Sequence, residues 1–322
     1  MNTRSTKEHR RNEIDSGHRL VDADRLGQVI EYAGRQLLET AGKLNADVYP
    51  RSVLGTEWKT ESASGHGWIQ GYFPGCLWLM YELTGDEKYL CEAEARTAPL
   101  EKYKADAHLN IEPHCIAYIL LTSYGNGFRL RGNESYRHVL LSGARSLDFR
   151  YVDQDNLKCY DMIEWGEFKD DSDKYSDAAD KVAVNADSMV SMELVFFSSA
   201  NGGDAKHREM ALNHLMRASK VIIKPDGSTY QVSGSSRRTG ELEFHRSHQG
   251  YTDKATGRVG TWSRGLSWCL HGYVVGYRYT LDPQLLELAQ RIADYHIANA
   301  PDDFIPYYDY EDPDIPNVEK DA

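Results

Sequence analysis

Apolar residues recur at three- and four-residue steps along most of the chain. The first such stripe consists of Leu26, Val29, Ile30, Ala33 and Leu37. This spacing places the side chains on one face of an α-helix. Strand signals are nearly absent, and the best of them is the short extended segment Gly227–Val232. The pattern therefore predicts a fold built almost entirely from helices.

A loose internal repeat connects these helices. Four times, a turn containing Asp or Asn precedes an amphipathic helix, and both residues favour the N-cap position. The four turns are Thr84-Gly85-Asp86, Arg131-Gly132-Asn133, Asn201-Gly202-Gly203-Asp204 and Thr280-Leu281-Asp282. Repeated turn-plus-helix units separated by another apolar helix indicate stacked helical hairpins, as in a toroid or a solenoid.

The domain organisation follows from length and linker content. A chain of 322 residues is long enough for one large domain or two ordinary ones. No linker rich in Pro, Gly or Ser divides it, so we expect one helical domain over residues 21–322. Residues 1–20 are charged and poor in apolar side chains, which predicts a disordered or loosely packed tail.

The charge balance restricts the partners. Acidic residues outnumber basic ones by 49 to 37, for a formal net charge of −12, so we expect no nucleic-acid or anionic-membrane partner. No apolar run reaches the roughly 18 residues of a membrane span, and no secretory signal is visible. The 5 scattered cysteines lack a CxxC motif and fit reduced thiols. We expect a cytoplasmic protein that is a monomer or a weak dimer.

The candidate chemistry is that of carboxylates among aromatic rings. The chain has 21 Tyr and 6 Trp but only 8 Phe, and Tyr and Trp suit walls that bind sugars. It lacks GxGxxG, P-loop, HExxH and GxSxG motifs, and its 12 His show no metal-ligand spacing. The acidic segment Asp161–Asp180 lacks EF-hand spacing and is interpreted as a solvated loop. Glycoside chemistry without a metal or organic cofactor fits these residues best.

Four segments carry a family resemblance: Trp68–Asp86, Asn185–Leu194, His248–Gly272 and Asp302–Asp309. They resemble, in order, motifs of the unsaturated glucuronyl hydrolases, a glycoside hydrolase family related to the unsaturated rhamnogalacturonyl hydrolases. The resemblance implies an all-α fold, the (α/α)6 toroid of the six-hairpin glycosidases. Against that fold the chain ends about one hairpin early, so we expect a toroid that lacks its last helix pair.

The resemblance also implies a reaction. The family removes a 4,5-unsaturated uronic acid from the non-reducing end of oligosaccharides that polysaccharide lyases leave behind. Protonation of the enol ether at C4 creates an oxocarbenium-like centre at C5, water adds there, and the hemiketal opens and releases the remaining sugar. One carboxyl can donate the first proton and accept the second. By motif match this carboxyl is Asp187, near the start of a helix capped by Asn185. The alternative is that Asp187 is only a first-turn helix carboxylate.

Further roles come from the same motif match. The aromatic residues implied to wall the sugar subsite are Trp68, Trp262 and Trp268. The excess of Tyr and Trp adds Tyr160 to the expected sugar-binding residues. The polar residues implied to bind the substrate are His114, Gln231, His248, Gln249 and Arg264. The planar fork of an arginine fits a carboxylate, which makes Arg264 a candidate for the uronate. The alternative is that the tryptophans are core residues, as we expect for Trp78, and that Arg264 pairs with an acidic helix.

One departure from the family pattern concerns the second catalytic position. The family places a second aspartate directly after a histidine, and this chain has His114-Cys115 there. A thiol, with an unperturbed pKa of about 8.5, does not replace a carboxylate at neutral pH. The second hypothesis is therefore a catalytically impaired homologue that only binds uronate oligosaccharides. A third is a helical scaffold without a sugar site.

Overall fold

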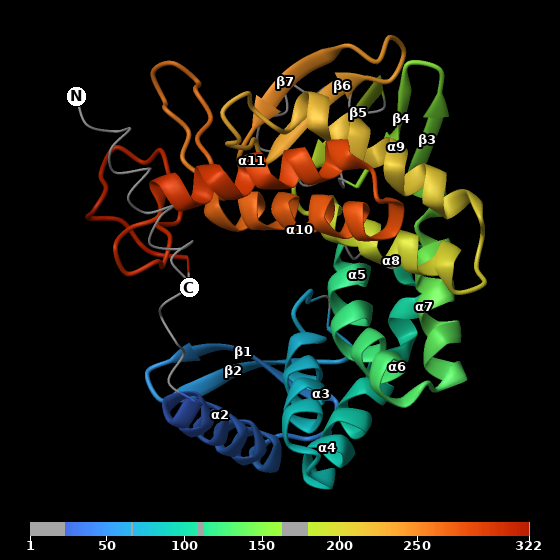
Figure 1. Cartoon of the computed structure of the whole chain (residues 1–322), viewed down its shortest axis with the longest axis vertical. Coiled ribbons are helices and arrows are strands. Elements are labelled where there is room, and N and C mark those ends of the chain that lie inside the picture. The colour runs from blue at the N-terminus through green and yellow to red at the C-terminus, as the bar shows by residue number, and fades with distance from the viewer. Residues whose placement is uncertain (1–22, 66, 109–112, 163–179, 322) are drawn as a thin grey trace. The chain divides into compact units, whose positions relative to one another are not determined.

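The computed structural model describes residues 23–65, 67–108, 113–162 and 180–321 (Figure 1). These residues divide into two compact units. The first unit comprises the described part of 1–111 together with 118–142, and the second comprises the described part of 112–117 together with 143–322. The tail expected over residues 1–20 and most of the acidic segment Asp161–Asp180 lie outside the described residues.

The first unit consists of helices and one β-hairpin. Its elements are α2 (Ala23–Lys43), β1 (Val48–Leu54), β2 (Glu57–Ser62), α3 (Tyr72–Thr84), α4 (Glu87–Thr97), the 3₁₀ helix η1 (Ala98–His108), the π-helical turn η2 (Leu121–Gly125) and α6 (Asn126–Arg131). Helix α2 confirms the first predicted helix. The buried Arg96 of α4 donates hydrogen bonds to the carbonyls of Ala41 and Leu44, at 2.7 and 2.9 Å. It thereby satisfies carbonyls at the end of α2 that have no partner inside the helix.

The second unit has a helical core with short β-sheets. Its elements are the 3₁₀ turn η3 (Asp148–Arg150), β3 (Tyr151–Gln154), β4 (Leu157–Tyr160), β5 (Lys181–Asn185), α8 (Ser188–Ala200), α9 (Lys206–Val221), β6 (Val232–Ser236), β7 (Leu242–Arg246), α10 (Ser263–Thr280) and α11 (Pro283–Asn299). Helix α8 packs against α9 and α10, and α10 lies along α11 (Figure 1). Helices α5 (Cys115–Leu120) and α7 (Glu134–Ser146) contribute residues to both units.

Small residues allow α10 to approach its neighbours closely. A Cβ added at Gly272 would lie 2.8 Å from the Cβ of Met189 on α8. A Cβ added at Gly276 would meet side chains of Leu215 on α9 and Leu285 on α11. At Gly272 the added Cβ would also lie 2.9 Å from the Met189 backbone oxygen, which cannot move aside as a side chain can, so glycine is required at that helix crossing. Helix α10 is thereby held tightly against the helix that follows Asp187.

The four predicted turn-plus-helix units are confirmed. In each turn the Asp or Asn side chain accepts a hydrogen bond from a backbone N–H two residues further on, in the first turn of the helix. The pairs are Asp86 with Lys88 before α4, Asn133 with Ser135 before α7, Asp204 with Lys206 before α9 and Asp282 with Gln284 before α11, each at 2.9 Å. These bonds satisfy orphan donors at the helix N-termini.

Strands are more frequent than the sequence pattern predicts. An antiparallel sheet of order β5-β6-β7 and a β3-β4 hairpin belong to the second unit, and β1 pairs with β2 in the first. Strand β6 has the sequence VSGSS, and all five of its residues are buried. Both faces of this strand are buried, and its side chains are mostly those of serine. The sequence therefore lacks the alternation of apolar and polar residues by which strands are usually recognised. Helices still dominate the described chain. None of the described helices has the length and apolar character that crossing a bilayer requires.

Candidate active site

Asp187 lies where strand β5 passes into helix α8. The side chain of Asn185 accepts a hydrogen bond from the Ser188 N–H at 3.0 Å, whereas the N-cap position of α8 itself is occupied by Asp187. Ser188 donates its hydroxyl proton to the Asn185 carbonyl at 2.6 Å. The Asp187 side chain retains 13% of its surface exposed, beside the positive end of the helix dipole. A carboxyl in this place is sheltered from water yet reachable by a ligand.

His114 is an ionisable neighbour of Asp187. Its Nε2 lies 4.0 Å from the Asp187 Oδ1, within ion-pair range but longer than a hydrogen bond. On the other side of the ring, Nδ1 lies 3.4 Å from the Met162 carbonyl oxygen. The hydroxyl of Ser191 on α8 donates to the His114 backbone carbonyl at 3.4 Å. Helix α8 thus carries Asp187 and also holds the segment that presents His114.

Cys115 follows His114 and begins α5. It is 5% exposed, so the thiol belongs to the buried surroundings of the site. All five cysteines of the chain are free thiols. Burial, reinforced by the charge of Asp187, raises the pKa of the buried Cys269 on α10. Cys269 is therefore a neutral packing group beside the carboxyl.

The first turn of α10 brings the aromatic and cationic residues to the same region. A Cβ at Gly265 would lie 3.3 Å from the Cβ of Ala186, the residue before Asp187. The neighbouring Arg264 has its guanidinium carbon 4.9 Å from the Trp262 ring centroid and 5.9 Å from that of Trp268. The two indoles meet edge to face at 5.2 Å. A cation flanked by two indoles is held in place by packing and by cation–π attraction.

Arg264 also faces a carboxylate of the chain. Its Nη1 lies 3.5 Å from the Asp321 Oδ1, and 36% of the arginine side chain is exposed. Trp262 is 3% exposed and Trp268 is half-buried. Trp262 therefore lies on the interior side of Arg264, and Trp268 lies nearer the surface. Asp321 follows α11 and lies outside the helices, so this partner of Arg264 is not the acidic helix of the alternative. The exposed part of the guanidinium can receive a second carboxylate.

Gln231 organises the loop that carries His248 and Gln249. Its Oε1 accepts hydrogen bonds from the backbone N–H of His248 at 2.6 Å and of Gln249 at 3.2 Å. Its Nε2 donates to the Gln249 side chain, and its backbone carbonyl accepts from the Ala186 N–H at 2.8 Å. The loop is therefore tied to the strand end next to Asp187. Direct hydrogen bonding of Gln231 to a sugar hydroxyl remains a prediction, whereas its contacts give it a positioning role.

The expectation for Tyr160 is wrong. The residue is 0% exposed, and its ring packs against Tyr151 and His214 at centroid distances of 5.1 and 5.8 Å. No surface of the ring remains for a sugar to touch. Tyr160 is a core residue of the second unit, because the β3-β4 hairpin packs on α9.

Trp68 and Trp78 belong to the first unit. Trp68 meets Tyr72 and Tyr118 edge-on, at centroid distances of 6.1 and 5.8 Å, and is half-buried. Trp78 is 0% exposed and its Nε1 donates to the Thr97 hydroxyl at 3.0 Å, which confirms the predicted core role. The contact of Trp68 with a sugar ring remains a prediction.

Sequence reasoning missed Asp309 as an organiser of the site loops. This buried carboxylate accepts hydrogen bonds from the backbone N–H groups of Tyr251, Thr261 and Glu311, at 2.8, 3.0 and 2.8 Å. Burial raises the pKa of Asp309, although the three N–H donors act in the opposite direction. The available signal was glycine at 250 and 260, where any Cβ would collide with this carboxylate. Asp309 fixes the loop that ends at Trp262.

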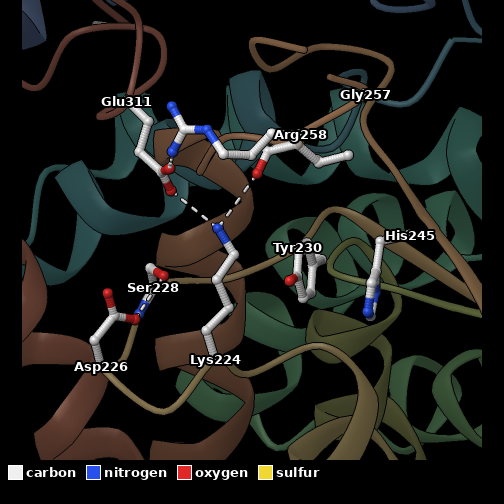
Figure 2. A pocket seen from close by; sticks show the side chains of 9 residues that line it. Lys224, Asp226, Ser228, Tyr230, His245, Gly257, Arg258 and Glu311 are labelled. Carbon is white, nitrogen blue, oxygen red and sulfur yellow. Dashed lines mark hydrogen bonds and ion pairs between the residues drawn. The ribbon is translucent and has the colours of Figure 1, made fainter. Parts of the chain in front are cut away.

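A groove of about 440 Å³ lies in the same unit (Figure 2). Figure 2 shows Lys224 reaching toward Glu311, with Tyr230 and His245 on the other side. Glu311 accepts from Lys224 at 2.9 Å and from Arg258 at 2.6 Å, so both cations of the groove are paired. Tyr230 stacks on His245 at 3.6 Å, and Lys224 covers the Tyr230 ring at 4.7 Å. The groove is electrically balanced and is not an evident anion site.

No three His, Cys, Asp or Glu side chains in the described ranges form a group that could hold a metal ion. The site chemistry that the structure offers is that of a carboxyl, an imidazole, a guanidinium and indole rings.

Comparisons with known proteins give a consistent result. No family model matches the chain. It is 30% identical over 282 residues to the unsaturated glucuronyl hydrolase of Formosa agariphila, covering 87% of this chain and 65% of that protein. It is 27% identical over 243 residues to the unsaturated chondroitin disaccharide hydrolase of Streptococcus pyogenes serotype M1, covering 75% of this chain and 56% of that protein.

The structural comparison agrees. A solved unsaturated glucuronyl hydrolase specific for heparin matches with a TM-score of 0.80 and 25% identity, over 92% of this chain and 74% of that chain. The likeness confirms the predicted fold class, all-α and of the (α/α)6 toroid type. The chain spans less than two thirds of the length of the two curated relatives, 65% and 56% respectively.

Proposed function

Because the chain belongs to the unsaturated glucuronyl hydrolase family, we propose that it removes a 4,5-unsaturated uronic acid from the non-reducing end of lyase-generated oligosaccharides. The observation that carries the proposal is the placement of Asp187, a sheltered but accessible carboxyl at the start of α8 with His114 at 4.0 Å. The indoles are proposed to contact the sugar ring, and Arg264 is proposed to bind its carboxylate. Both lie next to the turn that contains Asp187, because Gly265 of α10 packs closely against Ala186.

The reaction needs one carboxyl in two protonation states. Protonated Asp187 delivers its proton to C4 of the enol ether, and positive charge develops at C5 and the ring oxygen. The resulting carboxylate then accepts a proton from the water that attacks C5. The hemiketal opens to a ketone at C5 and a hemiacetal at C1, which releases the remaining sugar as an alcohol. One water is consumed, and Asp187 regains its starting proton.

The environment of Asp187 suits both halves of this cycle. Partial burial favours the neutral acid that must donate first. The helix dipole and a protonated His114 favour the carboxylate that must accept second. General acid–base catalysis requires that the same carboxyl take both forms in turn.

Arg264 is the proposed receptor of the uronate carboxylate. Its guanidinium is fixed between Trp262 and Trp268, and the planar fork can bind two carboxylate oxygens. The indole of Trp268 is half-buried and offers a ring face to the unsaturated sugar. His248 and Gln249 are exposed on the loop held by Gln231, and they are proposed to bind substrate hydroxyls.

The names of the relatives support a glycosaminoglycan-derived substrate. One is an unsaturated chondroitin disaccharide hydrolase, and one solved structure is described as specific for heparin. We propose that this chain acts on unsaturated glucuronyl disaccharides of that type. The five free thiols support a reducing compartment such as the cytoplasm. A monomeric or weakly dimeric state remains a prediction.

The test is an assay of the double bond itself. Purified protein is added to lyase-generated chondroitin and heparin disaccharides and to an unsaturated galacturonyl disaccharide, and the ultraviolet absorbance of the conjugated double bond is followed. The matched control is the same disaccharide with a saturated uronate. We expect absorbance loss and sugar release with an unsaturated substrate and neither with the saturated one. Unchanged absorbance with every unsaturated substrate, or equal cleavage of the saturated control, would overturn the proposal.

A further inference from the structure

His214 lies in the interior of the second unit, on helix α9, with a defined partner for each ring nitrogen. It is 0% exposed. Its Nδ1 accepts a hydrogen bond from the Tyr160 backbone N–H at 3.1 Å. Its Nε2 lies 2.8 Å from the Ser188 hydroxyl oxygen. Ser188 is the residue directly after Asp187.

These contacts determine the tautomer of His214. A backbone N–H can only donate, so Nδ1 carries the lone pair and Nε2 carries the proton. Nε2–H therefore donates to the Ser188 oxygen, and the Ser188 hydroxyl donates to the Asn185 carbonyl at 2.6 Å. A directed chain of hydrogen bonds runs from β4 through the imidazole to the turn that contains Asp187. Burial lowers the pKa of His214 to about 3, so the ring stays neutral at any ordinary assay pH.

This chain constrains the residues on both sides of Asp187. Asn185 is held through its carbonyl and through its side chain, which accepts from the Ser188 N–H. Ser188 is held through its hydroxyl and its N–H, so the turn has little freedom to rotate. A buried network in which every member is satisfied rigidifies its surroundings. The orientation of the Asp187 carboxyl depends on this turn.

We propose that His214 is a positioning residue for Asp187: its neutral imidazole, through Ser188, holds the first turn of α8 so that the carboxyl faces the substrate. The inference rests on the proposed hydrolase function of Asp187. On this inference, a buried histidine that does not contact the substrate contributes to kcat.

The same two helices contain a matched control. His207 of α9 places Nδ1 2.8 Å from the hydroxyl of Ser198 on α8, and both residues are 1% exposed. This is a second buried His–Ser contact between α8 and α9. Ser198 is ten residues after Ser188, which is about 15 Å along the helix. Loss of either serine hydroxyl removes a buried His–Ser hydrogen bond, and loss of the Ser188 hydroxyl also removes its bond to the Asn185 carbonyl. Only Ser188 adjoins Asp187.

The experiment compares Ser188→Ala with Ser198→Ala in the full chain. With an unsaturated disaccharide that the native protein cleaves, we expect Ser188→Ala to lower kcat by about 10- to 100-fold, the size of effect that small misplacement of a catalytic group produces. KM should change little, because the substrate-binding residues are untouched. Ser198→Ala should keep the native kcat. Equal kcat changes in the two variants, or a native kcat in Ser188→Ala, would overturn the inference.

Two further readouts keep the test decisive. His214→Gln retains an N–H donor for Ser188 and should keep more of the kcat than His214→Phe, which has none; the reverse order contradicts the inference. Crystal structures of the two serine variants should show a displaced or multiply oriented Asp187 carboxyl in Ser188→Ala alone. An unmoved carboxyl in Ser188→Ala refutes the positioning role. Absence of turnover by the native protein contradicts the proposed function instead, and the structures still test the positioning.

Discussion

The Nε2 of His114 lies 4.0 Å from the Oδ1 of Asp187, and the backbone carbonyl of the same histidine is held by Ser191 on the helix that Asp187 begins. The acid and its imidazole neighbour therefore share one rigid support. This arrangement explains how a site with Cys115 in place of a second carboxylate retains an ionisable group beside Asp187.

Replacement of Arg264 should weaken substrate binding more than it slows the reaction. A charge-assisted hydrogen bond is worth about 1.5–3 kcal/mol, so Arg264→Ala should raise KM by about 10- to 150-fold. The effect on kcat should be smaller, because the uronate carboxylate keeps its charge throughout the reaction. Steady-state kinetics on an unsaturated disaccharide measure both quantities.

Arg278→Ala is the matched control for this prediction. Arg278 lies in the last turn of the same helix α10 and is exposed. The Arg278→Ala variant should leave KM unchanged. A native KM in Arg264→Ala would show that another group binds the carboxylate.

Substitution of Cys115 distinguishes an enzyme from a binding-only homologue. Cys115→Asp supplies the second carboxylate that the family resemblance implies, and it should raise kcat above that of an already active native chain. Burial of a charge at this 5% exposed position should also lower the melting temperature. Cys115→Ala should retain turnover, because the thiol is not the acid. Activity confined to Cys115→Asp, with none in the native chain, would instead support the binding-only hypothesis.

His214 should make the stability of the protein depend on pH. Burial lowers its pKa to about 3 in the folded chain, from 6.5 in the unfolded chain. Below pH 6.5 His214 therefore binds a proton in the unfolded state but not in the folded state. The free energy of unfolding falls as the pH decreases toward 3. From about pH 7 to about pH 5 this one group should remove about 2 kcal/mol.

Urea denaturation of the native protein and of His214→Gln at both pH values measures this contribution. The variant should be less stable at neutral pH but should lose about 2 kcal/mol less on acidification. The half-buried histidines His245 and His296, whose pKa burial also lowers, act equally in both proteins and cancel in the difference. The same pH dependence in both proteins would show that His214 does not resist protonation in the folded state.

Local patterns in the sequence predicted much of this fold. Asp86 and Asp282 were recognisable as caps because capping involves neighbouring residues only. Trp78 could be assigned to the core from its place in an apolar helix. The fold class followed from helical periodicity together with the family resemblance.

Features that depend on distant partners were not predictable. The strand Val232–Ser236 was not predicted, because its buried serines and glycine give no alternation of apolar and polar residues. Tyr160 was misassigned because an aromatic residue in a core and one in a sugar site look alike in sequence. The bond between His214 and Ser188 joins residues 26 apart, so nothing in the local pattern marks either residue.

The central claim is that Asp187 is the acid and base of uronate hydration, and its most direct test is the kcat of Asp187→Asn on an unsaturated glucuronyl disaccharide. The amide can neither donate the first proton as an acid nor accept the second, so kcat should fall by about 10²- to 10⁴-fold with a native melting temperature. Asp204→Asn is the control, since Asp204 also stands before a helix and asparagine caps equally well there. It should keep the native kcat. A native kcat in Asp187→Asn would contradict the account.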